Sequence, residues 1–426
     1  MMVDEAGAFD RVDYDPGIYS HPRLTSKQVL VGLVRVSSGI TRTELALASA
    51  ISKSATAQFV AELIETNLVA EVSETPAGRQ VTRRSAVLRP VLPDVYVAGV
   101  HLAHGAIVTG IADMNGDTIA TSREPVDMLA PPEATLARAA DQLTALIDRQ
   151  APAGTDLGAI VTAIPGPIDR RTGAIKSPSV LSAWSGINPA EQLSTRLGLP
   201  VHVDNDANLG AWGELERGAA RRFRNAIYLE VSRGVGAGLI IDGRVYTGEA
   251  GIAGEIGHTQ VDPAGPLCRC GQNGCLEVVV ASGPILERLR RVHDNDPTRT
   301  LDSYTDEVSA RILREAGHTL GRVVAEASNI LNPQAVIVGG ELSSAHPAYL
   351  EGMREAMRRY VQPVVAQGLE VVPADLGDDA VLRGCFVRGA HSVFAREKEL
   401  EAQGRSLPRR AEGGLICTRP PAILAG

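Results

Sequence analysis

The residues best suited to chemistry lie close together between positions 254 and 277. His258, Cys268, Cys270 and Cys275 supply one imidazole and three thiols in this segment. Four such donors complete the tetrahedral shell of a structural zinc ion and leave no open position for a substrate. The alternative is three buried cysteines beside an unrelated histidine, but cysteine is scarce elsewhere and the intervening glycines suit a tight turn. The pattern therefore predicts a structural Zn²⁺ site that takes no part in catalysis.

The composition is that of a globular, multidomain chain. Its 426 residues suit about two or three domains, and 44% hydrophobic residues allow each domain to bury a core. No apolar run approaches the roughly 20 residues of a membrane span. The acidic start MMVDEAGAFDRVDYD differs from a secretory signal. We expect a cytoplasmic protein without a membrane partner, in which clustered cysteines indicate a metal rather than disulfides.

The net charge of −8 is unevenly distributed. Residues 1–20 carry five acidic and one basic side chain, whereas residues 21–90 carry nine basic and five acidic ones. A basic module beside an acidic body is typical of a nucleic-acid-binding head, although a segment with this excess of bases also arises by chance.

Residues 24–88 are expected to form three helices followed by a β-hairpin. Thr41 and Glu44 have the spacing of a capping box, which marks the start of the second helix. In the third helix, Ala55, Phe59 and Leu63 recur at helical spacing and are expected to face inward. This order of elements is typical of a winged helix-turn-helix, with its recognition helix at residues 52–64.

From Val95 onward the pattern changes to short strands. A strand–turn–strand–turn–strand pattern over residues 95–125 returns over residues 226–246, about 130 residues later. One repeat at this distance predicts two similar lobes with a cleft between them, which is the α/β plan of the actin-like and hexokinase-like ATPases. We therefore predict the following parts: an acidic, disordered leader (1–22), a winged helix-turn-helix (23–90), a first lobe (91–205, completed by a C-terminal helix at 380–398), a second lobe with the zinc site (206–379), and a disordered tail (403–426).

The segment GEIGHTQVDPAGPLCRCGQNGCLE also carries a resemblance to a known family. Its His-x9-Cys-x-Cys-x4-Cys spacing, followed by Leu-Glu, resembles the ROK family of repressors, open reading frames and sugar kinases. The resemblance extends from about Leu24 to Ala395, and in this family an N-terminal winged helix marks the repressor branch. It implies a homodimer, or a dimer of dimers, that binds operator DNA and a small sugar effector.

The resemblance also implies a sugar site. Asn205 and Asp206 match the family segment whose aspartate accepts the proton of the attacking sugar hydroxyl in the kinases. Glu255 and His258 match a Glu-x-x-His that holds sugar hydroxyls, and Glu277 matches the glutamate after the last zinc cysteine. His258 would then both bind zinc and face the sugar. Without the resemblance, Asp206 alone would be interpreted as the N-cap of the following helix.

The phosphate-binding loops depart from the family pattern. The kinases have Asp-x-Gly-Gly-Thr on the first hairpin, where this chain has His101, Ala103, His104 and Gly105. On the second loop Arg233 replaces a threonine. Losing one preorganised group of this kind costs about 10²–10³ in rate, so we expect no sugar kinase activity, with Asp206 as a vestigial base.

The expected DNA contacts are only moderately basic. Gln58 has the chemistry to read an adenine edge, and Lys53 to hold phosphate or guanine. Ala57 and Gln58 replace the Ser-Arg that is more usual in the family. The predicted DNA-binding residues are Arg42, Ser52, Lys53, Ser54, Thr56, Gln58, Gly78, Arg79 and Arg83. A winged helix used for protein contacts is the alternative.

Together these observations predict a sugar-responsive transcriptional repressor of carbohydrate metabolism genes, with structural zinc and no kinase activity. Two alternatives remain open. One is a bifunctional kinase-regulator, and the other is a sugar-independent regulator that keeps the cleft as a scaffold.

Overall fold

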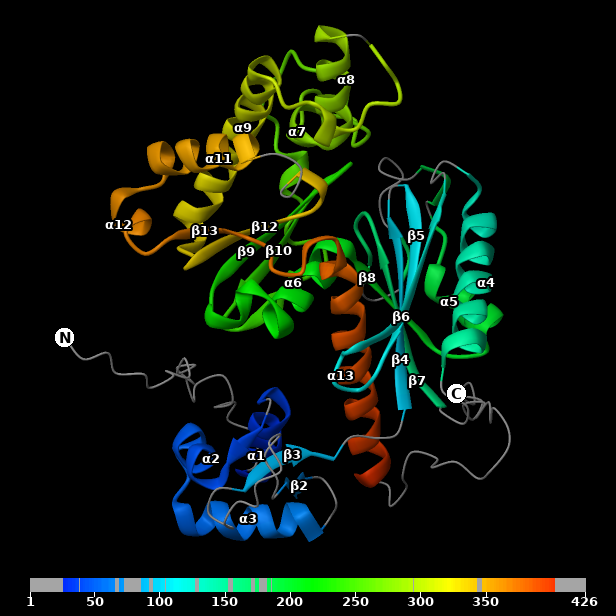
Figure 1. Cartoon of the computed structure of the whole chain (residues 1–426), viewed down its shortest axis with the longest axis vertical. Coiled ribbons are helices and arrows are strands. Elements are labelled where there is room, and N and C mark those ends of the chain that lie inside the picture. The colour runs from blue at the N-terminus through cyan, green and yellow to red at the C-terminus, as the bar shows by residue number, and fades with distance from the viewer. Residues whose placement is uncertain are drawn as a thin grey trace, which may run out of the picture. The chain divides into compact units, whose positions relative to one another are not determined.

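The computed structural model of the chain separates into two compact units, residues 1–93 and 94–426 (Figure 1). It describes residues 26–37, 39–65, 69–72, 86–91, 95–103, 105–126, 130–151, 156–169, 173–175, 182–184, 186–293, 295–342 and 347–402. The predicted leader, the predicted turn of the wing and the predicted tail lie outside these ranges. Among the described helices, none is both long and apolar enough to cross a membrane.

In its described residues, the first unit has three helices and a small antiparallel sheet. The elements are α1 (Ser26–Val36), β1 (Ile40–Thr41), α2 (Arg42–Ser49), α3 (Lys53–Glu65), β2 (Val69–Val72) and β3 (Val87–Pro90), with strand order β1-β3-β2. The capping box at the start of α2 is confirmed, because the Thr41 side chain accepts from the Glu44 amide and the Glu44 side chain accepts from the Thr41 amide. Ala50 then takes a left-handed conformation (φ 54°) that turns the chain toward α3.

The inward face of α3 differs by one residue from the predicted face. Thr56, Val60 and Leu63 are buried, whereas Ala55 and Phe59 are only partly buried. The prediction that Thr56 faces DNA is wrong: its side chain is 1% exposed and its hydroxyl donates to the carbonyl of Ile51 at 3.5 Å. A threonine fills a core position here, so the apolar spacing alone pointed to the neighbouring face.

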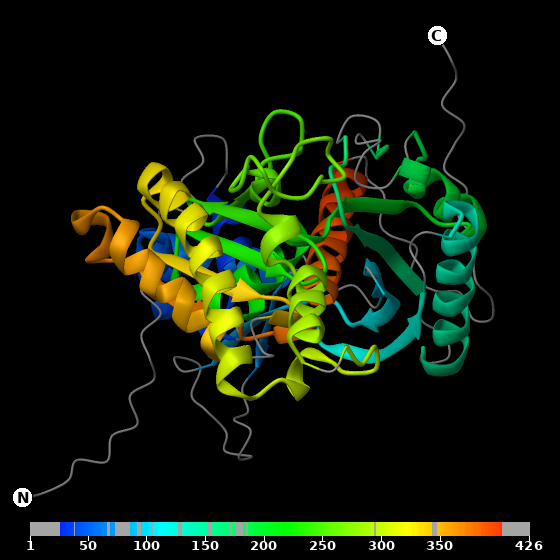
Figure 2. The same cartoon turned by 90° about the horizontal axis from the view of Figure 1, so that it is seen from above.

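In the second unit, the first lobe is built on a five-stranded sheet of order β6-β5-β4-β7-β8. Its strands are β4 (Val95–Ala103), β5 (Ala106–Ala112), β6 (Thr118–Pro125), β7 (Asp156–Ile164) and β8 (Val201–Asn205). The helices α4 (Pro132–Gln150) and α5 (Pro189–Leu197) cover one face, while α13 (Ala380–Ala402) covers the other (Figure 2). Gly99 and Gly110 allow the close approach of α13, since a Cβ at either would lie 2.8 Å from Leu382 or Phe386.

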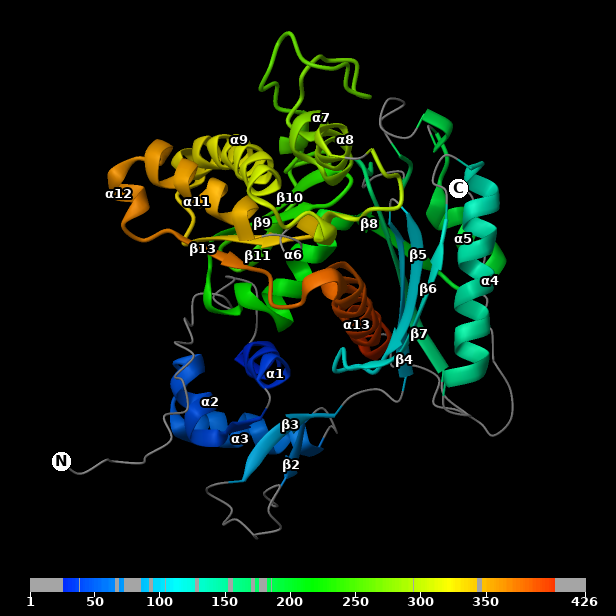
Figure 3. The same ribbon diagram turned by 45° about the horizontal axis from the view of Figure 1, so that its top comes forward.

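The second lobe repeats this plan. Its sheet has the order β11-β10-β9-β12-β13, from β9 (Ala226–Val231), β10 (Val235–Ile241), β11 (Arg244–Tyr246), β12 (Ala335–Gly339) and β13 (Glu370–Pro373). In both sheets three antiparallel strands are followed by two parallel ones, so the predicted long-range repeat is confirmed. The surrounding helices are α6 (Asp206–Arg217), α7 (Glu277–Val280), α8 (Ser282–Val292), α9 (Glu307–Leu331), α11 (Pro347–Tyr360) and α12 (Pro363–Ala366) (Figure 3).

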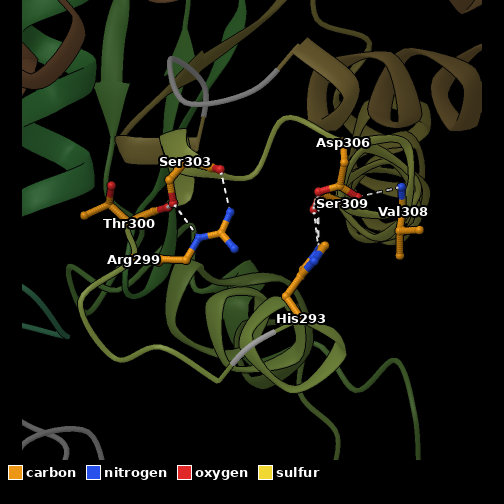
Figure 4. A network of polar contacts seen from close by, with 7 residues as sticks. All are labelled: His293, Arg299, Thr300, Ser303, Asp306, Val308 and Ser309. Carbon is orange, nitrogen blue, oxygen red and sulfur yellow. Dashed lines mark hydrogen bonds and ion pairs between the residues drawn. The ribbon is translucent and has the colours of Figure 1, made fainter.

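A polar network holds the connection between α8 and α9 (Figure 4). Asp306 caps α9, and its carboxylate accepts from the Ser309 hydroxyl at 2.6 Å. His293 Nε2 lies 2.9 Å from the same hydroxyl, and Arg299 donates to the Ser303 carbonyl at 2.7 Å. The trio of Ser, His and Asp is not a hydrolytic triad, because Ser309 is fully buried and its proton goes to the aspartate. The network is a helix cap that orders this loop.

Candidate metal centre and ligand cleft

The four predicted zinc ligands converge on one point. The ligand atoms of His258, Cys268, Cys270 and Cys275 all lie within 4.8 Å of one another. The Cys268 Sγ is 3.6 Å from His258 Nδ1, and the two sulfurs of Cys270 and Cys275 are 3.4 Å apart. These separations suit a tetrahedral set of one nitrogen and three sulfurs.

The loop that carries the thiols is held by its own backbone. Cys268 N–H donates to the Gln272 carbonyl at 2.7 Å, and Gly274 N–H donates to the Pro266 carbonyl at 2.7 Å. A side chain at Gly274 would be impossible, because a Cβ there would lie 1.6 Å from the Asp262 carbonyl. Burial and the neighbouring thiols raise the pKa of Cys275 to about 12, so this donor set needs a cation to hold its thiolates. The residues therefore fit a metal ion.

Beside the metal centre lies a cleft of about 580 Å³ that is lined by residues of both lobes. All five predicted sugar-binding residues line it: Asn205, Asp206, Glu255, His258 and Glu277. They come from the β8–α6 junction, the 3₁₀ turn at 256–258 and the start of α7. Residues from three separate stretches of chain thus meet in one cleft.

The junction between β8 and α6 presents Asp206 to the cleft. The N-cap of α6 is Asn205 rather than Asp206: the Asn205 side chain accepts from the Asn208 amide at 3.2 Å and donates to the Gly166 carbonyl at 3.1 Å. Asp206 is the first residue of the helix. Burial raises its pKa to about 8, and the nearby carboxylates of Glu230 and Glu255 act in the same direction.

His258 connects the metal centre to the cleft. Its Nδ1 faces the Cys268 sulfur, while its Nε2 lies 3.8 Å from the Glu255 carboxylate. A carboxylate that hydrogen-bonds to the far nitrogen of a metal-bound histidine fixes the ring and its tautomer, and Glu255 lies near the position where it could do so. Burial and the neighbouring Glu277 raise the pKa of Glu255 to about 7. Glu277 in turn accepts from the Val235 amide at 3.2 Å and lies 3.7 Å from Arg269 in the thiol loop.

Glu230 is one of several lining residues that were not predicted from the sequence. Glu230 lies on β9, and its carboxylate accepts from the Tyr228 hydroxyl at 2.6 Å and from the Ser232 hydroxyl at 2.8 Å. Burial raises the pKa of Glu230, while these two hydrogen bonds favour its charged form. The signal in the sequence was an acidic residue inside the apolar strand AIYLEV, between the buried Leu229 and Val231.

The two hairpin turns face the same cleft from opposite lobes. His101, Ala103 and Gly105 line it from the first hairpin, and Arg233 lines it from the second. The Arg233 side chain reaches across, since a Cβ built at Gly105 would lie 3.7 Å from its guanidinium carbon. His104 lies outside the described residues. The altered hairpins therefore meet through an arginine.

The predicted DNA-binding residues of the first unit have mixed outcomes. Ser52, Lys53, Ser54 and Gln58 are exposed, and Gln58 donates to Glu62 at 3.3 Å. Arg42 is partly buried, and its guanidinium donates two hydrogen bonds to the Glu71 carboxylate on β2. The other predicted contacts, Gly78, Arg79 and Arg83, lie outside the described residues. Arg42 is thus held against the sheet.

Comparison with known proteins gives consistent results. The model of the ROK family matches residues 97–388. A xylose repressor from Bacillus spizizenii is 28% identical over 363 residues, which cover 84% of this chain and 93% of that protein. A glucokinase from Thermotoga maritima is 28% identical over 311 residues, covering 69% and 96% of the two chains. The crystal structure of a ROK family transcriptional regulator, a homologue of E. coli MLC protein, covers 87% of this chain and 96% of its own with a TM-score of 0.69 at 22% identity.

Proposed function

The chain belongs to the ROK family, and on this basis we propose that it is a sugar-responsive transcriptional repressor of carbohydrate metabolism genes without sugar kinase activity. One observation carries the proposal. The five residues that we expect to bind a polyol all line one cleft, and the two hairpin turns that line the same cleft differ from the kinase pattern at His101, Ala103 and Arg233. The similarity to a xylose repressor extends over 84% of the chain, which is more than the sugar-kinase-like unit alone.

The sugar would bind through paired acceptors and donors. Carboxylates at Asp206, Glu255 and Glu277 accept hydroxyl protons, and the Asn205 amide both donates and accepts. These groups line the same cleft as the His258 ring. A neutral polyol satisfies such a set by many hydrogen bonds without requiring a bound counter-ion.

The metal ion would be structural. His258, Cys268, Cys270 and Cys275 would hold it with no open position, so its contribution is to keep the thiol loop folded and the His258 ring oriented. Glu255 and Glu277 contact this assembly directly, which couples the metal to the shape of the sugar site.

Kinase activity requires positioned charge around the transferred phosphoryl group. In this chain the first hairpin presents His101 and Ala103, and the second presents Arg233, whose side chain lies against Gly105. Glu230 adds a carboxylate to the same region. The retained Asp206 favours a bifunctional kinase-regulator as the second candidate.

The first unit would bind DNA as a winged helix. Ser52, which precedes α3, and Lys53, Ser54 and Gln58 in its N-terminal half would face the major groove, and the predicted wing with Gly78, Arg79 and Arg83 would add contacts. A homodimer would place two such helices on a palindromic operator, one helical turn or a multiple apart. Sugar binding would shift the populations of the DNA-binding and released states.

The test uses the full, metal-loaded chain and DNA from its own promoter region. We expect sequence-selective DNA binding in a gel-shift assay, a change in operator occupancy with at least one sugar of a panel, and no phosphate transfer in a coupled ATP assay. Failure to select DNA contradicts regulation, and turnover at ordinary enzyme rates identifies the kinase-regulator instead. Unchanged occupancy with every sugar identifies a sugar-independent regulator.

A further inference from the structure

The chain passes between the two lobes at two places, and the helices α6 and α13 lie at these places. The chain leaves the first sheet at the end of β8 and enters α6. It leaves the second sheet at the end of β13 and enters α13, which packs on the first sheet (Figure 1). Between β13 and α13 runs a connecting segment, residues 374–379. A change in the separation of the lobes must therefore act on α6, on this connecting segment or on the contact between α6 and α13.

The two helices touch through their backbones. A Cβ at Gly213 of α6 would lie 2.3 Å from the Ala380 carbonyl oxygen, and a Cβ at Gly384 of α13 would lie 1.7 Å from the Leu209 carbonyl oxygen. Glycine at both positions permits this close approach. Leu209 belongs to an apolar cluster with the first sheet, and Ala380 belongs to one with the second sheet. The crossing of α6 and α13 thus contacts both lobes.

Glu214 on α6 binds the connecting segment. Its Oε1 accepts from the Leu376 amide at 2.9 Å, and its Oε2 accepts from the Asp375 amide at 3.2 Å. The same Oε2 accepts from the Ala219 amide at 2.7 Å, in the turn that follows α6. One carboxylate therefore ties α6 to the segment that leads into α13.

The connecting segment depends on this carboxylate because the sheet ends just before it. The Ala374 amide donates to the Val338 carbonyl on β12 at 2.9 Å, and the next two amides along the chain donate to Glu214 instead. Glu214 is fully buried, and a Cβ at Gly218 would lie 2.1 Å from its Oε2. Loss of the carboxylate would leave these amides without their acceptor at a site that water does not easily reach.

Both of the tied segments carry groups of the cleft. Asp206 is the first residue of α6, and Asp378 lies in the connecting segment, two residues after Leu376. Asp206 and Asp378 line the cleft, whereas Glu214 does not. Glu214 can therefore affect the cleft only through the backbone that it holds.

We propose that Glu214 is a positioning residue for the cleft: it fixes the connecting segment against α6 and so holds the two lobes at the separation that ligand binding requires. Its effect on the ligand rests on the proposed sugar-binding function, whereas its effect on the connecting segment does not. Its role differs from that of an ordinary buried acid, because its three donors come from the chain after α6 and from the chain before α13.

The experiment compares Glu214→Gln with Glu216→Gln in the full, metal-loaded chain. Glu216 lies on the same helix, and its carboxylate is 3.9 Å from His391, so each variant loses one charge from α6. Hydrogen–deuterium exchange, measured by mass spectrometry, follows peptides that span residues 374–379. In Glu214→Gln we expect exchange there to become at least about tenfold faster, because the new amide group cannot accept all three hydrogen bonds.

Calorimetry with glucose, N-acetylglucosamine and xylose then measures ligand binding. For the sugar that binds the wild type, we expect the affinity of Glu214→Gln to fall by about tenfold. Glu216→Gln should follow the wild type in both measurements. This combination separates a positioning residue from a residue that only stabilises the fold, since the latter would leave the affinity of the folded chain unchanged.

A folded Glu214→Gln with wild-type exchange at residues 374–379 overturns the inference. Faster exchange with unchanged sugar affinity also overturns it. If Glu214→Gln fails to fold, the wild type decides: bound sugar should slow the exchange of the Asp375 and Leu376 amides further, and the absence of this effect contradicts the inference. If no sugar binds the wild type, the proposed function fails, while exchange at residues 374–379 still tests whether Glu214 holds the connecting segment.

Discussion

The residues that line the cleft fall into two groups with different chemistry. One group lies beside the candidate metal centre (the metal side), and the other belongs to the two hairpin turns (the hairpin side). On the metal side, Asn205, Asp206, Glu255 and His258 line the cleft together; Asn205 is fixed as the cap of α6, and His258 belongs to the candidate metal centre. On the hairpin side, the first turn has Ala103 and Gly105 where the kinases have a glycine and a threonine, and the Arg233 guanidinium of the second turn lies against Gly105. The proposed function thus requires that a two-lobed fold keep the sugar-binding half of a kinase site while the phosphate-binding half changes. The difference locates function in side chains rather than in the fold.

The substitution with the largest expected effect on this comparison is at the candidate metal centre. Cys275→Ser removes one of four converging ligands, and we expect loss of the metal, loss of sugar binding and a decrease of about 4 kcal/mol or more in stability. Metal content by mass spectrometry and the thermal midpoint measure it. Cys385→Ala, a buried cysteine outside the cluster, should retain the metal. Full metal content in Cys275→Ser would show that the cluster is not the metal site.

Asn205 gives the next largest effect. Asn205→Ala removes an amide from the polyol set, and we expect sugar affinity to fall by about a hundredfold. The same change removes the N-cap of α6, which costs about 1 kcal/mol. Asn205→Ser keeps a capping oxygen, so it should restore the thermal midpoint without restoring affinity. Recovery of sugar binding in the serine variant would mean that Asn205 acts only as a helix cap.

Sequence reasoning identified what lies in contiguous motifs or repeats. The metal ligands lie within one segment, and the two lobes repeat the same strand order, so both were predictable. Glu230 was not predicted because its place in the cleft depends on the packing of β9 in the folded chain, which the local sequence does not show. The Arg42–Glu71 pair joins residues 29 positions apart, which spacing along one helix cannot reveal. Thr56 was misplaced because a polar residue fills a core position, which moves the apparent apolar face by one residue.

The protonation of Asp206 makes the stability of the folded chain depend on pH. Its pKa is about 8 in the folded chain and near 3.8 when unperturbed. Between these two pH values, the folded chain keeps a proton on Asp206 that the unfolded chain has released. The free energy of unfolding therefore decreases as pH rises through this window. Asp206→Asn stays neutral throughout, and we expect it to be about 2 kcal/mol more stable than the wild type at pH 8.5, with a smaller difference at pH 6.

Differential scanning calorimetry of the full chain at both pH values measures this gain. The exposed Glu249→Gln provides the control for removing one negative charge, and it should follow the wild type. A stability difference for Asp206→Asn that is the same at both pH values would contradict a titrating Asp206. If Asp206→Asn is more stable at high pH but no longer binds sugar, Asp206 is a residue that supports binding at the expense of stability.

The smallest expected effect tests the hairpin side directly. Arg233 is exposed and its guanidinium lies against Gly105 of the first hairpin, so we expect Arg233→Ala to change sugar affinity by no more than about twofold. Arg233→Thr restores the residue type of the kinases, yet we expect no phosphate transfer, because His101 and Glu230 still occupy the same region. A coupled ATP assay and calorimetry measure both variants. A tenfold loss of sugar affinity in Arg233→Ala would contradict the comparison, because the hairpin side would then contribute to sugar binding. Turnover in Arg233→Thr would show that this arginine alone blocks phosphate transfer.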